Sequence, residues 1–589
     1  MKHPVAHVFS AMLAAMLLTG FAGPAKADAT SDFDTLLADF WESRMVNFPT
    51  FASSLGDRRF NDQWTDQSIN AIDDRQAERR EFLRRLYAID SKALSEDNQL
   101  NYELFRRNLQ SDVDSHQFKG YLIPFSHRGG VQTLNQTASR LRFTTVQDYE
   151  DWLLRMSKVD AVVEQTIARA ERGRKEGLIA PAILMQRIPA QIATQLVEAG
   201  IESPFYEEFE EMPDTISAAD QERLRASAIA TIEKVVVPAY RSLSRYFEQT
   251  YLPASRDSVG LSNLPHGDRW YELLTRNYTT TQMTPDDIHR LGLNEVRRIR
   301  DEMQLIIDEV EFDGDFQAFL NFLRTDPQFY YDNADDLYNA YLATSKRIDP
   351  ELVKLFGHLP RMPYGVKPIP AATAPDTTTA YYSRPAADGS RAGTYWVNLY
   401  MPEVRPKYEI EVLSVHEAMP GHHLQLALQQ ELGDMPEFRR FLGFTAFVEG
   451  WGLYSESLGH DLGLYKDPYS HFGALTYEMW RAVRLVVDTG LHYKGWTRQQ
   501  AIDFFKDNAA KTEHDIVNEI DRYIGNPGQA LAYKIGQLKI LAIRASAEAQ
   551  LGDDFDIRAF HDHLLGAGAL PLDLLQQRMD TWIAAQLSE

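Results

Sequence analysis

The residues best suited to chemistry are His416, Glu417, His422 and His423, which stand together in one short segment. In an H-E-x-x-H helix two imidazoles one turn apart grip a zinc ion, and the glutamate after the first histidine deprotonates a water held by the metal. Here the second histidine comes two or three positions later than in that pattern. On a regular helix His416 lies ~10 Å along the axis from His423 and ~120° around it from His422, so neither pair shares one ion without a distortion.

Pro420 and Gly421 supply a distortion of the right kind. A proline inside a helix removes a backbone hydrogen bond and clashes with the preceding turn, and a neighbouring glycine relieves the strain. The sequence therefore predicts a helix over residues 408–432 with a bulge at this point. Looping out two residues brings His422 close to His416, and bulged helices are frequent at functional sites. His423 stays open as the alternative ligand.

A third metal ligand is predicted on the next helix. His422 precedes Gly433 by 11 residues, and Glu449 follows Phe438 by 11. A helical hairpin with equal arms about a turn at 434–437 puts Glu449 level with His422.

Such a site is catalytic rather than structural. Two histidines and one glutamate leave a coordination position of a zinc ion open to water, and Glu417 is then the predicted general base. Glu456 lies seven residues after Glu449 on the same helix face, where it either supports a ligand or competes as one.

The segment before this helix has β-strand character. Thr and Tyr residues around 378–382 and the run 394–400 flank Asp388-Gly389, which indicates a hairpin. An edge strand beside a metal-binding helix can hold an extended peptide by strand addition, which makes Tyr395 and Asn398 candidate substrate-binding residues. A hairpin that only covers the helix is an equal alternative.

Most of the remaining chain has helical periodicity, as in residues 32–48, 74–89, 98–109, 146–176, 217–246 and 285–309. We therefore expect a mainly α-helical protein with a small β-hairpin or sheet beside the metal-binding helix. A helical scaffold lobe over residues 28–356 and a catalytic lobe over 357–589 are the predicted divisions.

The first 27 residues resemble a signal peptide. Lys2 precedes an apolar run from Val8 to Phe21, and Ala25-Lys26-Ala27 fits a small-x-small cleavage site. No later stretch has the ~20 consecutive apolar residues of a spanning helix. We expect export to the periplasm, with secretion to the medium as the alternative. The chain has no cysteine, so a metal site must use nitrogen and oxygen ligands, which suits an oxidising compartment.

The formal net charge is −23, from 61 basic and 84 acidic residues. Such an acidic chain is not expected to bind nucleic acid. The charge does not identify the substrate.

The motif from His416 to Gln425 resembles the H-E-x-x-P-G-H-H-L-Q hallmark of a large bacterial family, the domain-of-unknown-function family 885. Other segments that fit the family are 49–56, 395–398, 447–451 and 527–536. The family in turn resembles the helical glutamate-zincin peptidases, namely thimet-type oligopeptidases, Taq-type carboxypeptidases and angiotensin-converting enzyme. The resemblance implies a gluzincin-like architecture with a deep cleft that admits short peptides.

The resemblance also assigns roles to single residues. A Gly-His pair carries the second histidine ligand in those peptidases, which favours His422. Those peptidases also have a tyrosine near the C-terminal end of the chain that hydrogen-bonds the tetrahedral intermediate. Aligning the motifs puts Gln529 at the position of that tyrosine and Tyr533 one helical turn later. Either side chain can donate a hydrogen bond to an oxyanion. Lys534 is either an exposed lysine or a ligand for a substrate carboxylate.

The leading hypothesis is therefore a zinc-dependent metallopeptidase. A peptide-binding or envelope assembly protein without turnover is one alternative, and a zinc amidohydrolase acting on a non-peptide amide is another. A polar series on an otherwise apolar helix, formed by Arg481, Arg484, Asp488 and His492, fits an internal ion-pair network as well as it fits substrate binding.

Overall fold

A computed structural model describes residues 28–588 except 372–373, 375–376, 386–390 and 434. The predicted signal peptide, residues 1–27, lies outside the described residues. The fold is mainly helical with one three-stranded sheet, which confirms the coarse prediction of fold class. None of the described helices is long and apolar enough to cross a membrane.

The first four helices pack side by side through apolar faces. Phe33, Leu36 and Phe40 are buried on the first helix, and the ring of Phe40 meets Phe105 edge-on at 4.8 Å. Each of the longer helices begins with an Asp or Ser that caps backbone N–H groups, which is why the breaks fall where they do. The bounds are α1 Ala29–Asn47, α2 Pro49–Ser54, α3 Ile69–Tyr87 and α4 Glu96–His116.

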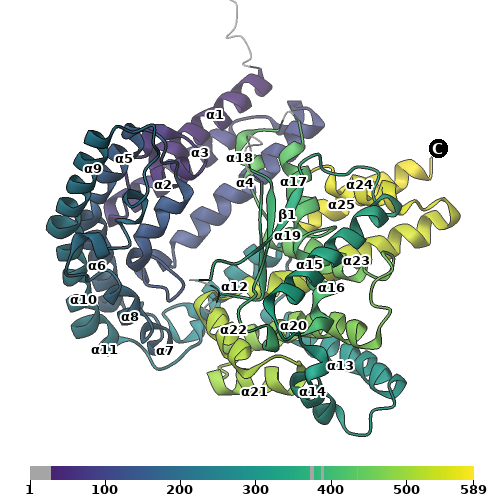
Figure 1. Cartoon of the computed structure of the whole chain (residues 1–589). Helices are drawn as coiled ribbons and strands as arrows, with labels where there is room; N and C mark the ends of the chain where they lie inside the picture. Colours follow the sequence, from purple (N-terminus) through teal and green to yellow (C-terminus); the bar gives the residue numbers. More distant parts are fainter. Residues whose placement is uncertain (1–27, 372–373, 375–376, 386–390, 434, 589) are drawn as a thin grey trace, which may run out of the picture.

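A second group of helices curves around one side of the molecule, at the left of Figure 1. Its members are α5 Val146–Met156, α6 Val159–Glu176, α7 Ala182–Met185, α8 Ile188–Ala193, α9 Ala218–Thr231, α10 Val237–Tyr246 and α11 Leu252–Ala254. Two π-helical stretches, Ile232–Val236 and Phe247–Tyr251, join the last three helices. The prediction of one helix over 146–176 missed the break between α5 and α6.

Several helices that precede residue 356 lie beside helices that follow it. Figure 1 shows α13, α14 and α15 beside α16 and α20, away from α5, α6, α9 and α10. Helix α13 packs closely along α20, where a Cβ at Gly292 would come within 2.7 Å of Leu485 Cβ. The bounds of this group are α12 Gly267–Thr279, α13 Pro285–Glu309, α14 Phe316–Thr325 and α15 Ala334–Ile348. Helices α12 to α15 therefore form part of the setting of the metal-binding segment.

The sheet has the order β1-β3-β2, with bounds β1 Tyr364–Pro368, β2 Ala380–Ser383 and β3 Gly393–Val397. Strands β2 and β3 pair antiparallel, as the predicted hairpin requires, and β1 joins β3 in parallel. The strand immediately before the metal-binding segment, β3, is thus central. A peptide cannot pair with it, because both of its edges are already bonded.

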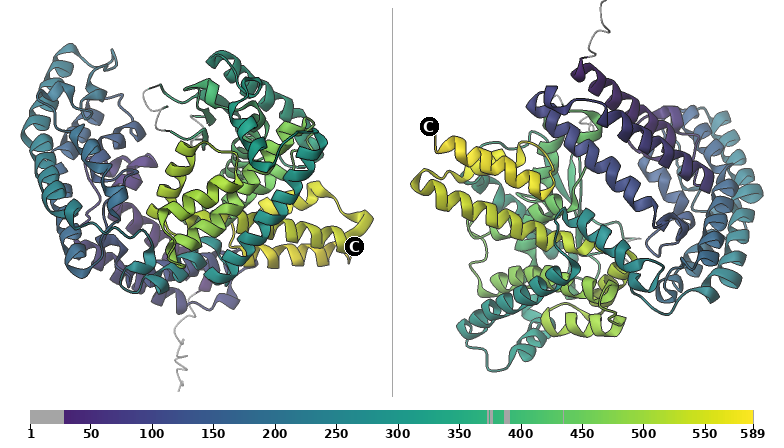
Figure 2. Two further views of the ribbon diagram at one scale, coloured as in Figure 1. Left: turned by 90° about the horizontal axis from the view of Figure 1, so that it is seen from below. Right: turned by 180° about the vertical axis from the view of Figure 1, so that it is seen from behind.

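The rest of the chain is helical: α16 Ile410–Glu417, α17 His422–Glu431, α18 Glu437–Arg440, α19 Thr445–Ser457, α20 Pro468–His492, α21 Arg498–Asn508, α22 Glu513–Gly525, α23 Ala532–Leu551, α24 Ile557–Leu565 and α25 Leu572–Gln586. Helices α19 and α23 touch backbone to backbone, since a Cβ at Gly450 would lie 2.5 Å from the Cα of Gly536. Figure 2 shows the yellow C-terminal helices projecting to one side of this group.

Candidate metal centre

The predicted bulge is a complete break between two helices. Helix α16 ends at Glu417, four residues turn, and α17 begins at His422. The turn folds back tightly, with the Gly421 N–H donating to the Val415 carbonyl at 2.9 Å. A Cβ at position 421 would lie 1.9 Å from the carbonyl oxygen of His416, so only glycine fits there.

This turn brings three predicted ligands together. The Nε2 of His422 lies 3.5 Å and the Nε2 of His416 3.8 Å from Oε2 of Glu449. One ligand atom from each of the three residues lies within 4.8 Å of the others. Both imidazoles pack over Gly452, whose Cβ would sit 2.9 Å from Cε1 of His416 and 3.2 Å from Cε1 of His422.

Glu449 does not reach the histidines through the predicted helical hairpin with arms of equal length. Helix α17 runs nine residues beyond His422, whereas α19 begins only four residues before Glu449, and α18 lies between them. The packing of α19 across α16, with Gly452 against the imidazoles, sets the level of Glu449 instead.

Glu456 fixes the orientation of His416. Its Oε1 lies 2.7 Å from Nδ1 of His416 and 3.6 Å from Nη2 of Arg481. A carboxylate only accepts hydrogen bonds, so Nδ1 carries a proton, and Nε2 is the ring nitrogen that faces Glu449. Glu456 therefore supports a ligand, which is the first of the two roles predicted for it.

The shifted pKa values of His416 and Glu449 indicate that this group of side chains favours a bound positive charge. Burial opposes charge on His416, but Glu449 and Glu456 outweigh it and raise its pKa to about 9. Burial likewise would raise the pKa of Glu449, yet its interactions with His416 and His422 lower that pKa well below the usual range. A proton on His416 thus holds the place that a metal ion would take.

The residues fit a zinc ion. Ligand atoms bound ~2.1 Å from one tetrahedral zinc are about 3.4 Å apart, close to the distances that Glu449 keeps here. The side chains of His416, His422 and Glu449 are 3%, 12% and 20% exposed, so the site is closed behind His416 and open toward solvent at the other two. Three protein ligands with one open side are the pattern of a catalytic zinc site.

His423 points away from this site. Its Nε2 lies 3.0 Å from the Met362 carbonyl, and its Nδ1 lies 2.8 Å from the Tyr382 hydroxyl. Burial lowers its pKa to about 4, so the ring is neutral, with Nε2–H donating and Nδ1 accepting. Neither nitrogen is left for a metal, and the geometry favours His422 as the second ligand.

Comparison with known proteins gives a family but no activity. Residues 49–579 match the family of bacterial proteins of unknown function called DUF885. The chain belongs to the DUF885 family. No curated protein matches it.

Two solved structures share the fold of this DUF885 protein. A protein described as a candidate lipoprotein from Colwellia psychrerythraea is 28% identical, with a TM-score of 0.86 over 95% of this chain and 100% of that one. A candidate lipoprotein of unknown function from Shewanella oneidensis is 18% identical, with a TM-score of 0.74 over 94% of this chain and 100% of that one.

Tyr533 and Gln529 lie beside the ligands. Tyr533 stands one turn before Gly536, which touches the residue after Glu449. Burial raises the pKa of Tyr533, and the charge of Glu449 adds to the rise. Gln529 accepts a hydrogen bond of 2.8 Å from Arg522 through its Oε1. Both residues keep partly exposed side chains in the DUF885 protein.

The other residues suggested for substrate contact are buried. Lys534 is fully buried between Glu295 and Glu478, an internal ion-pair network in place of a solvent-facing lysine. Tyr395 is fully buried against Tyr341. The amide of Asn398 donates to the carbonyls of Ala374, Thr377 and Thr378 and so holds the loop between β1 and β2.

The polar series on α20 serves several purposes. Asp488 accepts from the Tyr271 hydroxyl at 2.5 Å and from the Gly528 N–H at 3.0 Å, and His492 bonds the backbone of Leu261 and Tyr523. These two residues have internal roles. Arg481 lies beside Glu456, and Arg484 stacks on Tyr533, so two members of the series face the candidate site.

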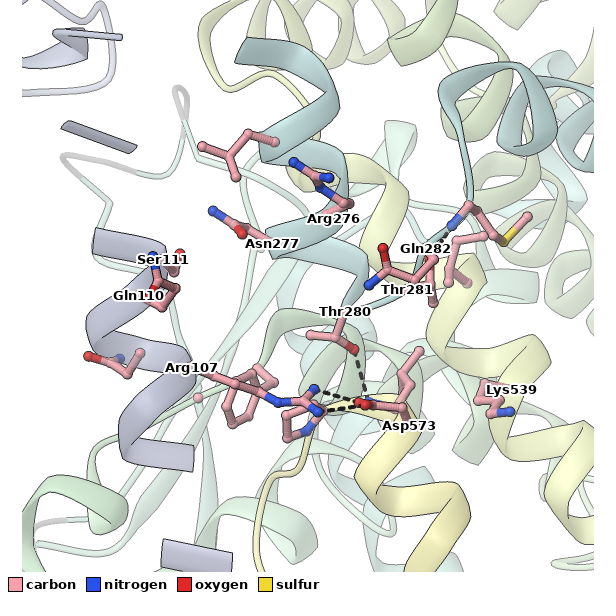
Figure 3. Close-up of a pocket in the computed structure, with 18 of the residues that line it drawn as sticks. Arg107, Gln110, Ser111, Arg276, Asn277, Thr280, Thr281, Gln282, Lys539 and Asp573 are labelled. Carbon is pink, nitrogen blue, oxygen red and sulfur yellow. Dashed lines mark hydrogen bonds and ion pairs between the residues drawn. The ribbon is translucent and has the colours of Figure 1, made fainter. Parts of the chain in front are cut away.

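A separate pocket of about 980 Å³ lies behind α23, between α4 and α12 (Figure 3). Arg107 and Asp573 form an ion pair of 2.6 Å across it, as the dashed lines in the figure show. Ile535 and Lys539 face this pocket from the side of α23 opposite to Tyr533. None of His416, His422 and Glu449 lines it, so it is distinct from the candidate metal centre.

Gly452 was not identified from the sequence as part of the site. The Gly450-x-Gly452 spacing is the one local signal that was available, because two glycines inside a helix indicate close approach of other groups. Arg481 was noted in the polar series of its helix, but its contact with Glu456 depends on the packing of α20 against α19, which the sequence does not reveal.

Proposed function

We propose that this DUF885 protein is a zinc-dependent hydrolase, and most specifically a metallopeptidase that cleaves short peptides. The observation that carries the proposal is the convergence of His416, His422 and Glu449, with Glu417 directly beside the first ligand. Bound at these ligands, zinc supplies Lewis acidity toward a substrate carbonyl and a water molecule.

Glu417 is the proposed general base. It is the last residue of α16 and is partly exposed, and its carboxylate has no hydrogen bond or ion pair within the described part of the chain. It is therefore free to accept the proton of the attacking water and to pass it to the leaving amine. Tyr533 or Gln529 then donates a hydrogen bond to the oxygen of the scissile carbonyl as negative charge develops there.

An envelope location is part of the proposal. The segment 1–27 has the pattern of a signal peptide, and the two solved structures that share the fold are described as candidate lipoproteins. A site built from nitrogen and oxygen ligands is also compatible with an oxidising compartment.

The test compares the parent protein with Glu417→Gln, each loaded with zinc and incubated with a peptide library that is read by mass spectrometry. Both should hold about one zinc ion, and the variant should cleave about 100- to 10,000-fold more slowly. Glu403→Gln is the matched control, since Glu403 is an exposed glutamate shortly before the same helix, without a hydrogen bond or ion pair in the described residues. Equal turnover by Glu417→Gln would refute the base assignment. Zinc binding without cleavage of any peptide by the parent would refute the peptidase.

A further inference from the structure

Three arginines, Arg484, Arg522 and Arg128, gather next to Tyr533. The guanidinium of Arg484 lies 4.3 Å from the centre of the Tyr533 ring. Arg522 donates to Gln529 at 2.8 Å and to Glu519 at 2.9 Å. Glu519 also pairs with Arg484 at 3.2 Å, so a single carboxylate serves both arginines.

The third arginine comes from the other side of the molecule. A Cβ at Gly525, the end of α22, would lie 3.2 Å from the His127 ring, so the segment carrying Arg128 touches the helix that carries Arg522. Arg128 is exposed, and within the described residues its guanidinium has no hydrogen bond or ion pair. Although the residue as a whole is exposed, partial burial of its guanidinium, and then repulsion from Arg522, lower the pKa of Arg128.

The cluster therefore carries an unbalanced positive charge. Within the described residues, Glu519 is the only carboxylate that forms an ion pair with Arg484 or Arg522, and Arg128 has none. Arg484 is 4% exposed, and its Nη1 is buried without a hydrogen-bond partner. A buried guanidinium with an unpaired donor is costly, and a bound anion offsets that cost.

The position of the cluster says which anion it would meet. Tyr533 stands one helical turn from the contact between α23 and the residue after Glu449, so the cluster begins beside the metal ligands and extends away from them. One extended residue spans about 3.5 Å. A negative group one or two residues beyond a carbonyl held at the metal thus reaches the arginines.

We infer that Arg128, Arg522 and Tyr533, backed by Arg484, form a subsite for the C-terminal carboxylate of a peptide. The inference rests on the proposed function and adds a mode of action to it. The protein would release one or two residues from the C-terminus, and it would discriminate against peptides whose terminal carboxylate is blocked. Arg128 would close the subsite from the opposite lobe.

The test measures binding apart from turnover. Two matched pools of synthetic tetrapeptides, one with free and one with amidated C-termini, are equilibrated by dialysis with zinc-loaded Glu417→Gln protein, and bound peptides are quantified by mass spectrometry. Amidation should weaken binding about 10- to 100-fold, the range of a charge-assisted hydrogen bond to a carboxylate. The same pools are then incubated with the zinc-loaded parent, and the products are identified.

Arg128→Gln, made in the Glu417→Gln background, is the decisive variant because its side chain has no partner to leave unpaired. It should bring the binding of the free-acid pool down toward that of the amide pool. Arg140→Gln is the control, an exposed arginine of the same lobe that also lacks a hydrogen bond or ion pair of its side chain in the described residues. It should change nothing. Arg522→Gln should have the same effect as Arg128→Gln, but it leaves Glu519 less well paired and is a weaker test.

The outcomes separate the two proposals. Discrimination between the pools without cleavage by the parent would keep the carboxylate subsite and refute the peptidase. Cleavage with equal binding of both pools, or release of N-terminal residues, would keep the peptidase and refute the subsite. An Arg128→Gln protein that discriminates as well as Arg140→Gln, or the absence of binding from either pool, would also overturn the inference.

Discussion

Replacing Gly452 with alanine should weaken zinc binding although it removes no ligand. The new Cβ would stand 2.9 Å from Cε1 and 3.0 Å from Nε2 of His416, and 3.2 Å from Cε1 of His422. Comfortable contacts between such atoms are about 3.5–4.0 Å, so the His416 ring must retreat by roughly 0.6–1.1 Å and the His422 ring by roughly 0.3–0.8 Å. Zinc sites hold their ligand distances to about ±0.2 Å, and a shift of that size exceeds the tolerance.

The expected magnitude follows from the cost of overpacking. An extra methyl group in a packed region costs about 1–3 kcal/mol, which corresponds to a loss of zinc affinity of roughly 5- to 150-fold. The metal-free protein should suffer less, because alanine is favoured over glycine inside a helix by about 0.5–1 kcal/mol and Gly452 lies within α19. Gly452→Ala should therefore lower the zinc affinity more than it lowers the free energy of unfolding of the metal-free protein.

The assay is a competition titration for zinc against a chromophoric chelator, together with thermal unfolding of the metal-free protein. Gly443→Ala is the control, since a Cβ there meets no atom within 4 Å. It should bind zinc as the parent does. If Gly452→Ala keeps the affinity of the parent, the imidazoles do not bind zinc in the positions described, and the metal centre is placed wrongly.

Two further predictions follow from the surroundings of the site. His422→Ala should lose stoichiometric zinc while His423→Ala keeps it, because Tyr382 and Met362 occupy both ring nitrogens of His423. The measurement is metal analysis of each variant after dialysis. Loss of zinc only in His423→Ala would reverse the ligand assignment. Burial raises the pKa of Asp488 from 3.8 to about 7, so the folded protein binds a proton more tightly than the unfolded chain and its stability falls as the pH rises from about 4 to 7. Urea unfolding of Asp488→Asn and of the parent is measured at pH 5 and pH 8. The free energy of unfolding of the variant should rise relative to that of the parent at the higher pH, by at most about 4 kcal/mol for the full pKa shift. A difference between the two proteins that is the same at both pH values would contradict a raised pKa of Asp488.

The helices that the sequence predicted well are those with local stop and start signals. Helix α13 begins and ends at the predicted residues, because Thr284 and Asp287 form a capping box and Pro285 occupies the first turn. The break between α5 and α6 escaped because residues 157–158 carry neither proline nor glycine. Strand β1 escaped too, since its pairing with β3 depends on a contact across the chain.

The candidate site divides in the same way. His416, Glu417 and His422 belong to one motif, so local reasoning found them and the need for a turn at Pro420. The partners of His423 lie 41 and 61 residues away in the chain, and Arg128 lies nearly 400 residues before Arg522. Contacts of that kind are fixed by tertiary packing, which no local pattern contains.

Close backbone approach explains how the helices around the metal centre reach their positions. Gly421 lets the turn rest on the His416 carbonyl, Gly452 lets α19 rest on both imidazoles, and Gly450 and Gly536 bring α19 onto α23. Each contact replaces a flexible side chain with rigid backbone, so helix packing alone holds His416, His422, Glu449 and Tyr533 in place. Binding an ion at such a site would need little rearrangement of the side chains. A methyl group at Gly452 disturbs this arrangement without removing a ligand, so it tests the geometry of the site more directly than the loss of a ligand does.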